Sequence, residues 1–478
     1  MIVNMTETFF FYDLETSGLD ARRDRVMQFA GQRTTLDLEP IGEPYDVLVR
    51  LSDDVLPSPD AILVTGITPQ KTQEEGITEA EFARLFHHEI CVPGTIVVGF
   101  NNIRFDDEFM RHTLWRNFYD PYEWCWKDGR SRWDILDVIR MTRALRPEGI
   151  VWPVDKDGKA TNRLELLTKQ NGLEHLKAHD ALSDVYGLIA VTKLLKEKQP
   201  KLYEYLLSIR DKKAVMRLVN LEDAKPFVYT SGRYDSSFQK TTVAFPIAEG
   251  TKPGSVLVYD LRHDPSLLVD LDVAALKKRL FAKWEERKKP GFQPVPIKEL
   301  TYNRTPAVAP LGVLEQENGW ENIQLEKAMI EKHLQVLSRS PELIDRLRAA
   351  LASRAPFPKA TDVDGQLYDG FINGKDKTHS EAIRNASLRE LADFHPEFID
   401  ERMPHLLLRY KGRNFPVALS EDEQQAWEEY RSSRLQSDFP RFMEALARLS
   451  KERSGEDTQF ILQELQLWAE SIVPVDVA

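Results

Sequence analysis

From Thr8 to about Pro200, short apolar stretches alternate with helical patterns, which predicts an α/β layer fold. The apolar stretches predict strands at 9–14, 26–36, 45–51 and 95–100. Residues with a 3.6-residue period predict helices at 79–89, 106–117, 133–144, 163–171 and 181–198. Pro200 follows the last of these helices, so a first domain is expected to end at about residue 200.

The pattern changes beyond residue 200. Short strands at 226–230, 241–246 and 255–260, interrupted by Gly and Pro, and a helix at 273–287 predict a small β-rich domain over 201–352. Helical patterns return at 380–394, 421–435, 440–453 and 458–472. We therefore expect three domains: an α/β domain at 1–200, a β-rich domain at 201–352 and an α-helical domain at 353–478.

Length and cysteine content agree with a multidomain protein of a reducing compartment. The chain has 478 residues, more than the roughly 250 to 300 at which a single core stops growing. No apolar run approaches the roughly 18 residues that a membrane span needs. Cys91 and Cys125 are too few for a disulfide framework or a thiolate zinc site, so a cytoplasmic location is expected.

The overall charge does not by itself indicate a nucleic-acid partner. Phosphate binding depends on clustered Lys and Arg, and the net charge of the chain is −12. Such a partner is not excluded, because an acidic metal site and a local basic lining can lie within a protein whose outer surface is acidic.

Two carboxylates stand at the end of the first predicted strand. Asp13 and Glu15 occupy positions i and i+2, so both side chains project from the same face of the sheet. A pair of this kind suits a hard divalent cation. Alone it is a weak signal, because Asp-x-Glu is common and usually lies in a solvated turn.

Two further carboxylates stand near predicted helix starts. Asp106 opens the helix that follows an apolar strand, where it caps free N–H groups, serves as a ligand, or does both. Asp184 lies about one turn inside the helix that begins near Ala181, among apolar residues, where a carboxylate is unfavourable unless it is paired or bound to metal. His179 precedes the same helix, and capping is the simpler reading of Asp180.

Together these three segments resemble the DEDDh family of 3′-to-5′ exonucleases, whose pattern is D-x-E, an Asp that heads a helix, and H-x-x-x-x-D. The resemblance implies that Asp13, Glu15, Asp106 and Asp184 hold two metal ions and that His179 is the general base. The residue types suit phosphodiester hydrolysis, because two Mg²⁺ ions, for which Mn²⁺ can substitute, stabilise the attacking and leaving oxygens together. A histidine, with an ordinary pKa of about 6.5, accepts a proton near neutral pH.

Further segments extend the resemblance to the bacterial exonuclease I family over nearly the whole chain. They are LVTGITPQ at 63–70, RNFYDPY at 116–122, SRWD at 131–134, ALRPEGI at 144–150 and RNFP at 413–416. The resemblance implies an RNase H-like exonuclease domain, an SH3-like β-barrel domain and a C-terminal helical domain. It also implies processive digestion of single-stranded DNA to 5′-mononucleotides, in DNA repair and recombination, with the strand in a groove among the domains.

Arginine and aromatic residues near the motifs are candidates for that groove: Arg111, Arg116, Phe118, Tyr119, Tyr122, Trp124 and Trp126. Bases of any sequence stack on aromatic rings, and Arg contacts phosphates. We predict strand contacts for Arg111, Tyr122 and Trp126 and core positions for Phe118 and Trp124. Arg163 and Glu15 match substrate-binding positions of the family.

The family also binds the acidic C-terminal tail of single-stranded DNA-binding protein, through basic residues around an apolar pocket. Arg146 and Tyr205 match that site, whereas Pro310 and Glu315 replace an amide and an arginine. Because Glu315 would repel an acidic peptide, either this partner is not bound or its site has moved. Ser17 is a second departure, since close relatives carry an aromatic residue there and proofreading and RNA-trimming relatives do not.

Two other functions stay open. A DEDDh exonuclease that trims RNA ends or proofreads a polymerase would share the motifs, but such relatives usually lack the two further domains. A non-catalytic module that binds single strands would keep the fold, but the intact metal and base residues argue against it. A monomer is expected, because three domains of one chain can close a groove without a second subunit.

Overall fold

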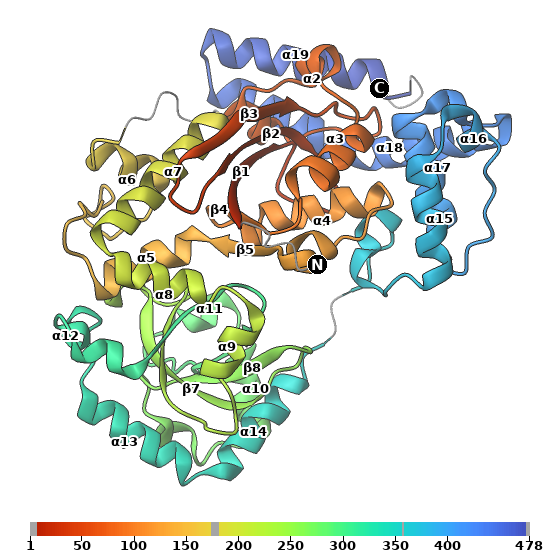
Figure 1. Ribbon diagram of the computed structural model, residues 1–478. Coiled ribbons are helices and arrows are strands. Elements are labelled where there is room, and N and C mark those ends of the chain that lie inside the picture. Colours follow the sequence, from red (N-terminus) through yellow and green to blue (C-terminus); the bar gives the residue numbers. More distant parts are fainter. Residues whose placement is uncertain (1–6, 174–180, 356–357, 475–478) are drawn as a thin grey trace, which may run out of the picture. The chain divides into compact units, whose positions relative to one another are not determined.

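The computed structural model describes residues 7–173, 181–355 and 358–474, and it divides into two compact units (Figure 1). The first unit comprises Met1–Ser131, His175–Leu188 and Pro358–Ala478. The second comprises Arg132–Glu174 and Ile189–Phe357. The C-terminal helices thus form one body with the N-terminal sheet, although residues 132–357, most of which belong to the second unit, lie between Ser131 and Pro358 in the sequence.

The first unit is built on a mixed sheet. Its strands are β1 (Thr8–Thr16), β2 (Val26–Thr34), β3 (Pro40–Leu48) and β4 (Thr95–Gly99), in the order β3-β2-β1-β4. β1 runs antiparallel to β2 and parallel to β4. Because Phe9, Phe10 and Phe11 are fully buried, both faces of β1 are covered, as its continuous aromatic run predicts.

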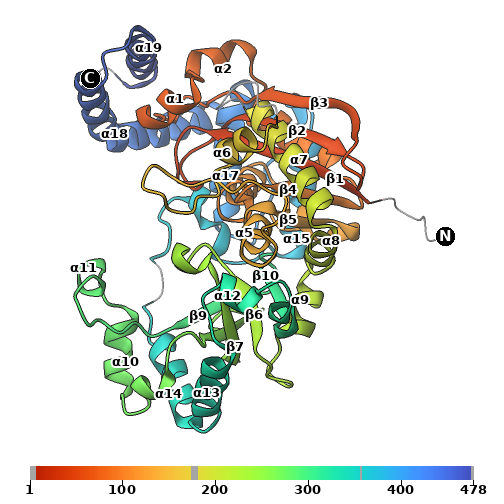
Figure 2. The ribbon, with the colours of Figure 1, turned by 90° about the vertical axis from the view of Figure 1, so that its left-hand side faces the viewer.

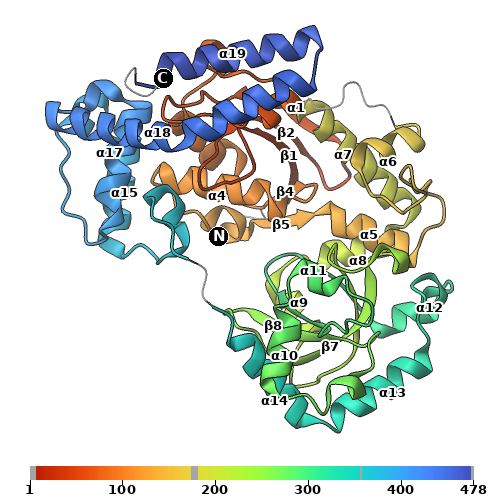
Figure 3. The same cartoon turned by 180° about the vertical axis from the view of Figure 1, so that it is seen from behind.

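Helices of this unit pack on the sheet or on one another. They are α1 (Pro59–Thr65), α2 (Pro69–Glu75), α3 (Glu79–Leu85), α4 (Asp106–Arg116), α15 (Gly374–Asn385), α16 (Leu388–Ala392), α17 (Arg402–Asn414), α18 (Glu421–Glu452) and α19 (Glu456–Ile472). Phe82 and Phe86 pack against Phe29 of β2 in one core. In a second core, Met27 of β2 lies with Ile62 of α1 and apolar residues of α18 and α19, and these helices run beside α1 (Figures 2 and 3).

The second unit contains an all-antiparallel sheet of five strands in the order β10-β6-β7-β8-β9. The strands are β6 (Phe227–Thr230), β7 (Thr241–Glu249), β8 (Ser255–Asp260), β9 (Ile297–Thr301) and β10 (Ala307–Pro310). Its helices include α5 (Ile135–Leu145), α6 (Leu164–Gln170), α8 (Pro200–Ser208), α9 (Lys212–Leu218), α10 (Val273–Leu280), α11 (Trp284–Arg287), α12 (Gly319–Asn322), α13 (Lys327–Ser338) and α14 (Pro341–Ala352). β5 (Ser131–Asp134) and α7 (Ala181–Lys198) contain residues of both units.

Several predicted elements are wrong in detail. The helix predicted at 380–394 is two helices, α15 and α16, separated at Ala386 and Ser387. Trp133 and Asp134 belong to β5 rather than to a helix, and α5 begins only after Asp134, whose carboxylate accepts the N–H of Leu136 at 3.0 Å. The helix predicted at 273–287 is interrupted between α10 and α11. The helices predicted on either side of Pro440 are one helix, α18, because buried residues before and after the proline pack into the same core.

The order of secondary-structure types along the chain is as predicted: an α/β N-terminal part, a β-rich middle part and a helical C-terminal part. The domain boundaries at 200 and 352 stay predictions. Within the described part of the chain, no helix combines the length and the apolar character that crossing a membrane would require.

Candidate metal centre

Three of the predicted metal ligands lie together. Asp13 and Glu15 project from β1, and Asp184 projects from the first turn of α7. One ligand oxygen from each side chain lies within 4.8 Å of the others, and all three side chains are half-buried. This spacing suits carboxylates that share a cation, whereas unpaired carboxylates at the same spacing would repel one another.

Asp106, the fourth predicted ligand, is not among the three carboxylates whose oxygens lie within 4.8 Å of one another, but its charge acts on Asp13. It is the first residue of α4 and is only 5% exposed. Burial raises the pKa of Asp13 well above its usual value, and the neighbouring charges of Asp106, Glu15 and Asp184 raise it further. The three clustered carboxylates offer oxygen donors of the kind that a hard divalent cation such as Mg²⁺ prefers, and a ligand role for Asp106 stays a prediction.

The start of α4 is fixed to the sheet by a residue that the motif does not include. Asp107 is fully buried, and its carboxylate accepts hydrogen bonds from the hydroxyl of Tyr12 at 2.7 Å and the amide of Asn102 at 3.1 Å. Tyr12 precedes Asp13 on β1, so this contact joins the strand and the helix that carry two of the ligands. The sequence indicates that Asp107 could support the metal ligands, and the tertiary structure shows the partners through which it acts, Tyr12 and Asn102.

His179 and Asp180 lie outside the described residues. The role of His179 as general base therefore stays a prediction.

Four of the candidate groove residues, Arg116, Phe118, Tyr119 and Trp124, are buried in the core. Phe118 and Trp124 are 3% and 1% exposed, as predicted, and Tyr119 is also buried. Arg116 is buried too, and its guanidinium group donates to the carboxylate of Glu79 at 2.6 Å. It is therefore not available to a strand.

The three predicted strand contacts differ in exposure. Arg111 is 9% exposed and pairs with Glu108 at 2.9 Å, Tyr122 is half-buried, and Trp126 is 63% exposed. Arg163 is exposed at the N-cap of α6 in the second unit. None of these positions by itself tests a contact with DNA, so the four contacts stay predictions.

The predicted partner site of the second unit is internally paired. Arg146 is 8% exposed and pairs with Glu317 at 3.1 Å. The hydroxyl of Tyr205 donates to the carbonyl of Val308 at 3.3 Å. Glu315, in contrast, is paired with Lys327 at 2.9 Å, so its negative charge is partly compensated.

A pocket lies close by in the same unit. It is lined by Arg217, Leu218, Asn220, Asp223, Lys225, Pro226, Phe227, Pro310 and Leu311. The lining combines apolar residues, Pro310 among them, with Arg217, Lys225 and Asp223, and the ammonium of Lys225 lies 4.0 Å from the carboxylate of Asp223.

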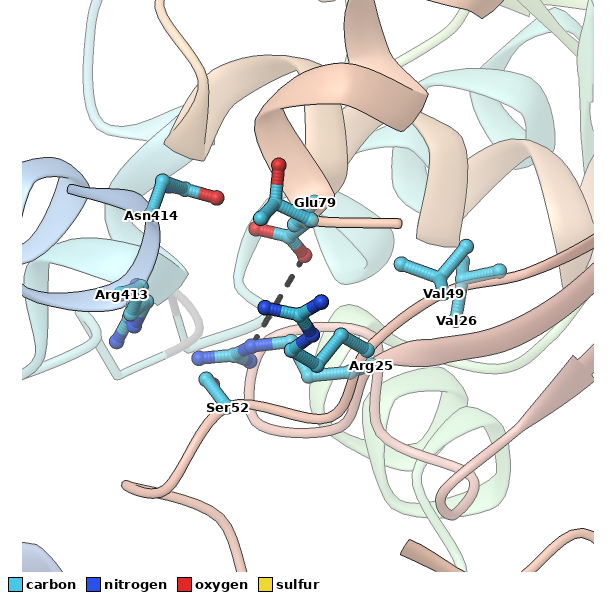
Figure 4. A pocket seen from close by; sticks show the side chains of 9 residues that line it. Arg25, Val26, Val49, Ser52, Glu79, Arg413 and Asn414 are labelled. Carbon is cyan, nitrogen blue, oxygen red and sulfur yellow. Dashed lines mark ion pairs between the residues drawn. The ribbon is translucent and has the colours of Figure 1, made fainter. Parts of the chain in front are cut away.

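The RNFP segment joins the C-terminal helices to the loop that follows β3 and to α3. Arg413 donates to Asp54 at 2.8 Å and to Asp364 at 2.7 Å, and Asn414 accepts the N–H of Ala80 at 3.0 Å. Figure 4 shows the pocket beside this network, with Arg413, Asn414 and the ion pair between Arg25 and Glu79. The carboxylates of the candidate metal centre do not line this pocket, and the contacts of Arg413 and Asn414 indicate that the segment stabilises the packing of the C-terminal helices.

Ser17 belongs to the same part of the fold. It is fully buried, and its hydroxyl accepts the N–H of Arg25 at 2.9 Å. The hydroxyl of Ser17 thus stabilises the turn between β1 and β2.

Family models match three consecutive parts of the chain. An exonuclease model matches residues 10–192, an exonuclease I SH3-like domain model matches 210–353, and an exonuclease I C-terminal domain model matches 361–472. The exonuclease, SH3-like and helical domains implied by the resemblance are therefore confirmed.

Individual members of the family resemble this chain over almost its full length. Exodeoxyribonuclease I of Escherichia coli (strain K12) is 38% identical over 98% of this chain and 98% of its own. A crystal structure of E. coli exonuclease I with a dA16 oligonucleotide superposes with a TM-score of 0.94 at 37% identity, covering 98% of this chain and 100% of the other.

Two further structures concern a metal and a partner. The zinc-bound form of an E. coli exonuclease I complex with single-stranded DNA has a TM-score of 0.93 at 37% identity, and a complex of SSB/exonuclease I with the inhibitor CFAM has 0.89 at 36% identity. Each covers 98% of this chain and 100% of the other. With this full-length likeness, the chain belongs to the exodeoxyribonuclease I family.

Proposed function

We propose that this chain is a metal-dependent exonuclease that removes 5′-mononucleotides processively from the 3′ end of single-stranded DNA. The observation that carries the proposal is the cluster of Asp13, Glu15 and Asp184, with their oxygens within 4.8 Å of one another and Asp106 close by. Full-length membership of the exodeoxyribonuclease I family supports the choice of DNA as substrate.

The four carboxylates would hold two Mg²⁺ ions, or Mn²⁺ in their place. When bound, such ions stabilise the charge that develops on the attacking and leaving oxygens of the phosphodiester. The neighbouring carboxylates that raise the pKa of Asp13 support this proposal, because a cation relieves their mutual repulsion.

The remaining steps fall to the protein's own side chains. His179 would take the proton of the attacking water through a ring nitrogen, since an imidazole is half protonated near neutral pH. The contact of Tyr12 with Asp107 would keep β1 and α4 in register, so that Asp13 and Asp106 do not shift during turnover.

The acidic tail of single-stranded DNA-binding protein is the proposed partner, in a displaced site. The pocket lined by Phe227, Pro310 and Leu311 would take the apolar end of the tail, and Arg217 and Lys225 would face its carboxylates. Binding of this tail would bring the nuclease to single-stranded DNA that is coated with the binding protein, as a role in DNA repair would require.

The decisive experiment uses 3′-labelled and 5′-labelled DNA oligonucleotides and a matched RNA, with Mg²⁺ or with EDTA. Immediate release of labelled mononucleotide from the 3′-labelled DNA is expected, and EDTA should abolish it. Asp184→Asn and His179→Ala should each lower kcat by at least about a hundredfold. Asp60→Asn and His405→Ala, which alter exposed residues, are the matched controls and should keep wild-type activity.

The other outcomes separate the alternatives. Faster digestion of the RNA would assign the chain to RNA trimming, and binding without cleavage under all conditions would leave a non-catalytic module. Mg²⁺ titration by calorimetry provides a readout that does not depend on activity, since Asp184→Asn should weaken metal binding whereas Asp60→Asn should not.

A further inference from the structure

The pocket beside Arg413 and Asn414 is small and partly polar. It has a volume of about 20 Å³, which is enough for one or two water molecules or for one small anion such as chloride. Its walls come from four segments of the first unit: the start of β2, the loop that follows β3, the start of α3 and the end of α17 (Figure 4). A ligand in this pocket would therefore contact both the C-terminal helices and the N-terminal part of the unit.

Arg25 brings an unused hydrogen-bond donor to the pocket. One terminal nitrogen of its guanidinium group donates to Asp364 at 2.9 Å, and the other donates to the carbonyls of Arg23 at 2.8 Å and Asp24 at 3.2 Å. Its Nε is buried and has no hydrogen-bond partner within the described part of the chain. A buried N–H without an acceptor is unfavourable, so an acceptor in the pocket would stabilise Arg25.

The carboxylate of Glu79, which also lines the pocket, does not fill this role. It lies 4.0 Å from the Nε of Arg25, beyond hydrogen-bond distance. It accepts instead from the guanidinium group of Arg116 at 2.6 Å and from the side-chain amide of Asn117 at 3.0 Å. The charge of Glu79 is therefore matched by Arg116 rather than by Arg25.

The ion-pair network around the pocket contains more cations than anions. Within the described part of the chain, its carboxylates are those of Asp54, Glu79, Asp362 and Asp364. Its guanidinium groups, on side chains at most 11% exposed, are those of Arg25, Arg116, Arg409, Arg413 and Arg434. Five positive charges thus meet four negative ones, and an excess charge away from solvent is unfavourable.

The excess of positive charge acts on Arg25. Burial lowers the pKa of its guanidinium group, and the neighbouring charges of Arg116, Arg413 and Arg434 lower this pKa further, to about 10, although Asp364 opposes them. A water molecule in the pocket would accept the N–H of Arg25 and leave the excess charge in place. An anion would do both, because it accepts a hydrogen bond and compensates the charge.

We propose that this pocket binds one small monovalent anion of the size of chloride, which accepts the Nε–H of Arg25 and lies in the positive field of Arg25 and Arg413. The anion is a structural ligand rather than a participant in hydrolysis, since the carboxylates of the candidate metal centre do not line the pocket. By joining the start of β2 to the end of α17, it stabilises the packing of the C-terminal helices.

The first test measures the thermal unfolding of the full chain by differential scanning calorimetry. Sodium chloride replaces sodium gluconate at a constant total sodium concentration, because gluconate is too large for the pocket. The transition of the first unit should move up by about 3 to 5 °C for each tenfold increase of chloride above its dissociation constant.

A cavity-filling variant separates the pocket from general effects of salt. Val49 lines the pocket and is 1% exposed, so Val49→Ile places an additional carbon atom in it and should abolish the chloride-dependent shift. Val47→Ile makes the same change two positions earlier, outside the pocket lining, and should shift with chloride as the wild type does.

The second test identifies the ligand in crystals of the wild type soaked in sodium bromide. Anomalous diffraction at the bromine absorption edge should show a peak in the pocket within hydrogen-bond distance of the Nε of Arg25. This result does not require that either variant folds. In crystals of Val49→Ile, the same peak should be absent.

Three results would overturn the anion site. They are density in the wild-type pocket without anomalous signal, which is the mark of water, a wild-type transition that does not respond to chloride, and an equal response in Val49→Ile. None of these results changes the exonuclease proposal, which depends on the digestion of DNA in the presence of Mg²⁺.

Discussion

The carboxylate of Asp364 is the centre of the buried charge network that joins the C-terminal helices to the sheet. It is fully buried and accepts from Arg413 at 2.7 Å, from Arg25 at 2.9 Å and from Arg409 at 3.2 Å. Asp364→Asn keeps the shape of the side chain and removes the charge. The three guanidinium groups then lose the charge of a shared, fully buried partner, which solvent cannot replace.

The expected loss is large. Removing one partner of a buried ion pair costs about 3 to 5 kcal/mol, because the remaining charge stays buried without compensation. In a domain of roughly 150 to 250 residues, each kcal/mol shifts the melting temperature by about 2 to 4 °C. We therefore expect the transition of the first unit to move down by about 10 °C in Asp364→Asn.

Differential scanning calorimetry measures this shift directly. The matched control is Asp60→Asn, which breaks an Asp–Arg pair of similar length, 2.7 Å, whose side chains are about half exposed. Exposed pairs contribute about 0 to 1 kcal/mol. A shift in Asp364→Asn no larger than that in Asp60→Asn would refute the reasoning, because it would mean that the network is solvated or relaxes freely.

Three further predictions concern acid stability, the metal centre and the partner. Burial opposes the charge of Asp364, but the surrounding guanidinium groups outweigh it and hold its pKa well below the usual range. A lowered pKa adds stability at pH values above the unfolded pKa of about 3.9, and this stability is lost as the pH falls below that value. In urea unfolding between about pH 5 and pH 2, the free energy of unfolding should therefore fall more steeply for the wild type than for Asp364→Asn. Parallel curves would contradict this. Tyr12→Phe removes a donor from buried Asp107 and should lower the free energy of unfolding by about 1 to 3 kcal/mol and reduce kcat; unchanged calorimetry and kinetics would show that the contact is dispensable. Lys225→Glu should weaken the binding of an acidic C-terminal peptide in fluorescence anisotropy, and Glu315→Arg should strengthen it, whereas no response to either change would place the peptide elsewhere.

The sequence determined what depends on local spacing. The two-residue period of a strand puts Asp13 and Glu15 on one face, and the aromatic run before them predicts a buried strand, which β1 is. Likewise, Asp106 and Asp184 stand at helix starts because the patterns that mark those starts are local. The likeness to the exonuclease I family carried the domain types, which periodicity alone left as α/β, β-rich and helical.

The tertiary structure alone decided which charged and aromatic side chains are accessible. Arg111 and Arg116 lie on the same helix, but Arg116 is buried against Glu79 while Arg111 lies beside the ring of Tyr122. Phe371 reaches that ring from a segment 249 positions beyond Tyr122, so no local pattern could have assigned it. Burial and charge pairing depend on partners that are distant along the chain, and their placement follows from the packing of the C-terminal helices on the sheet.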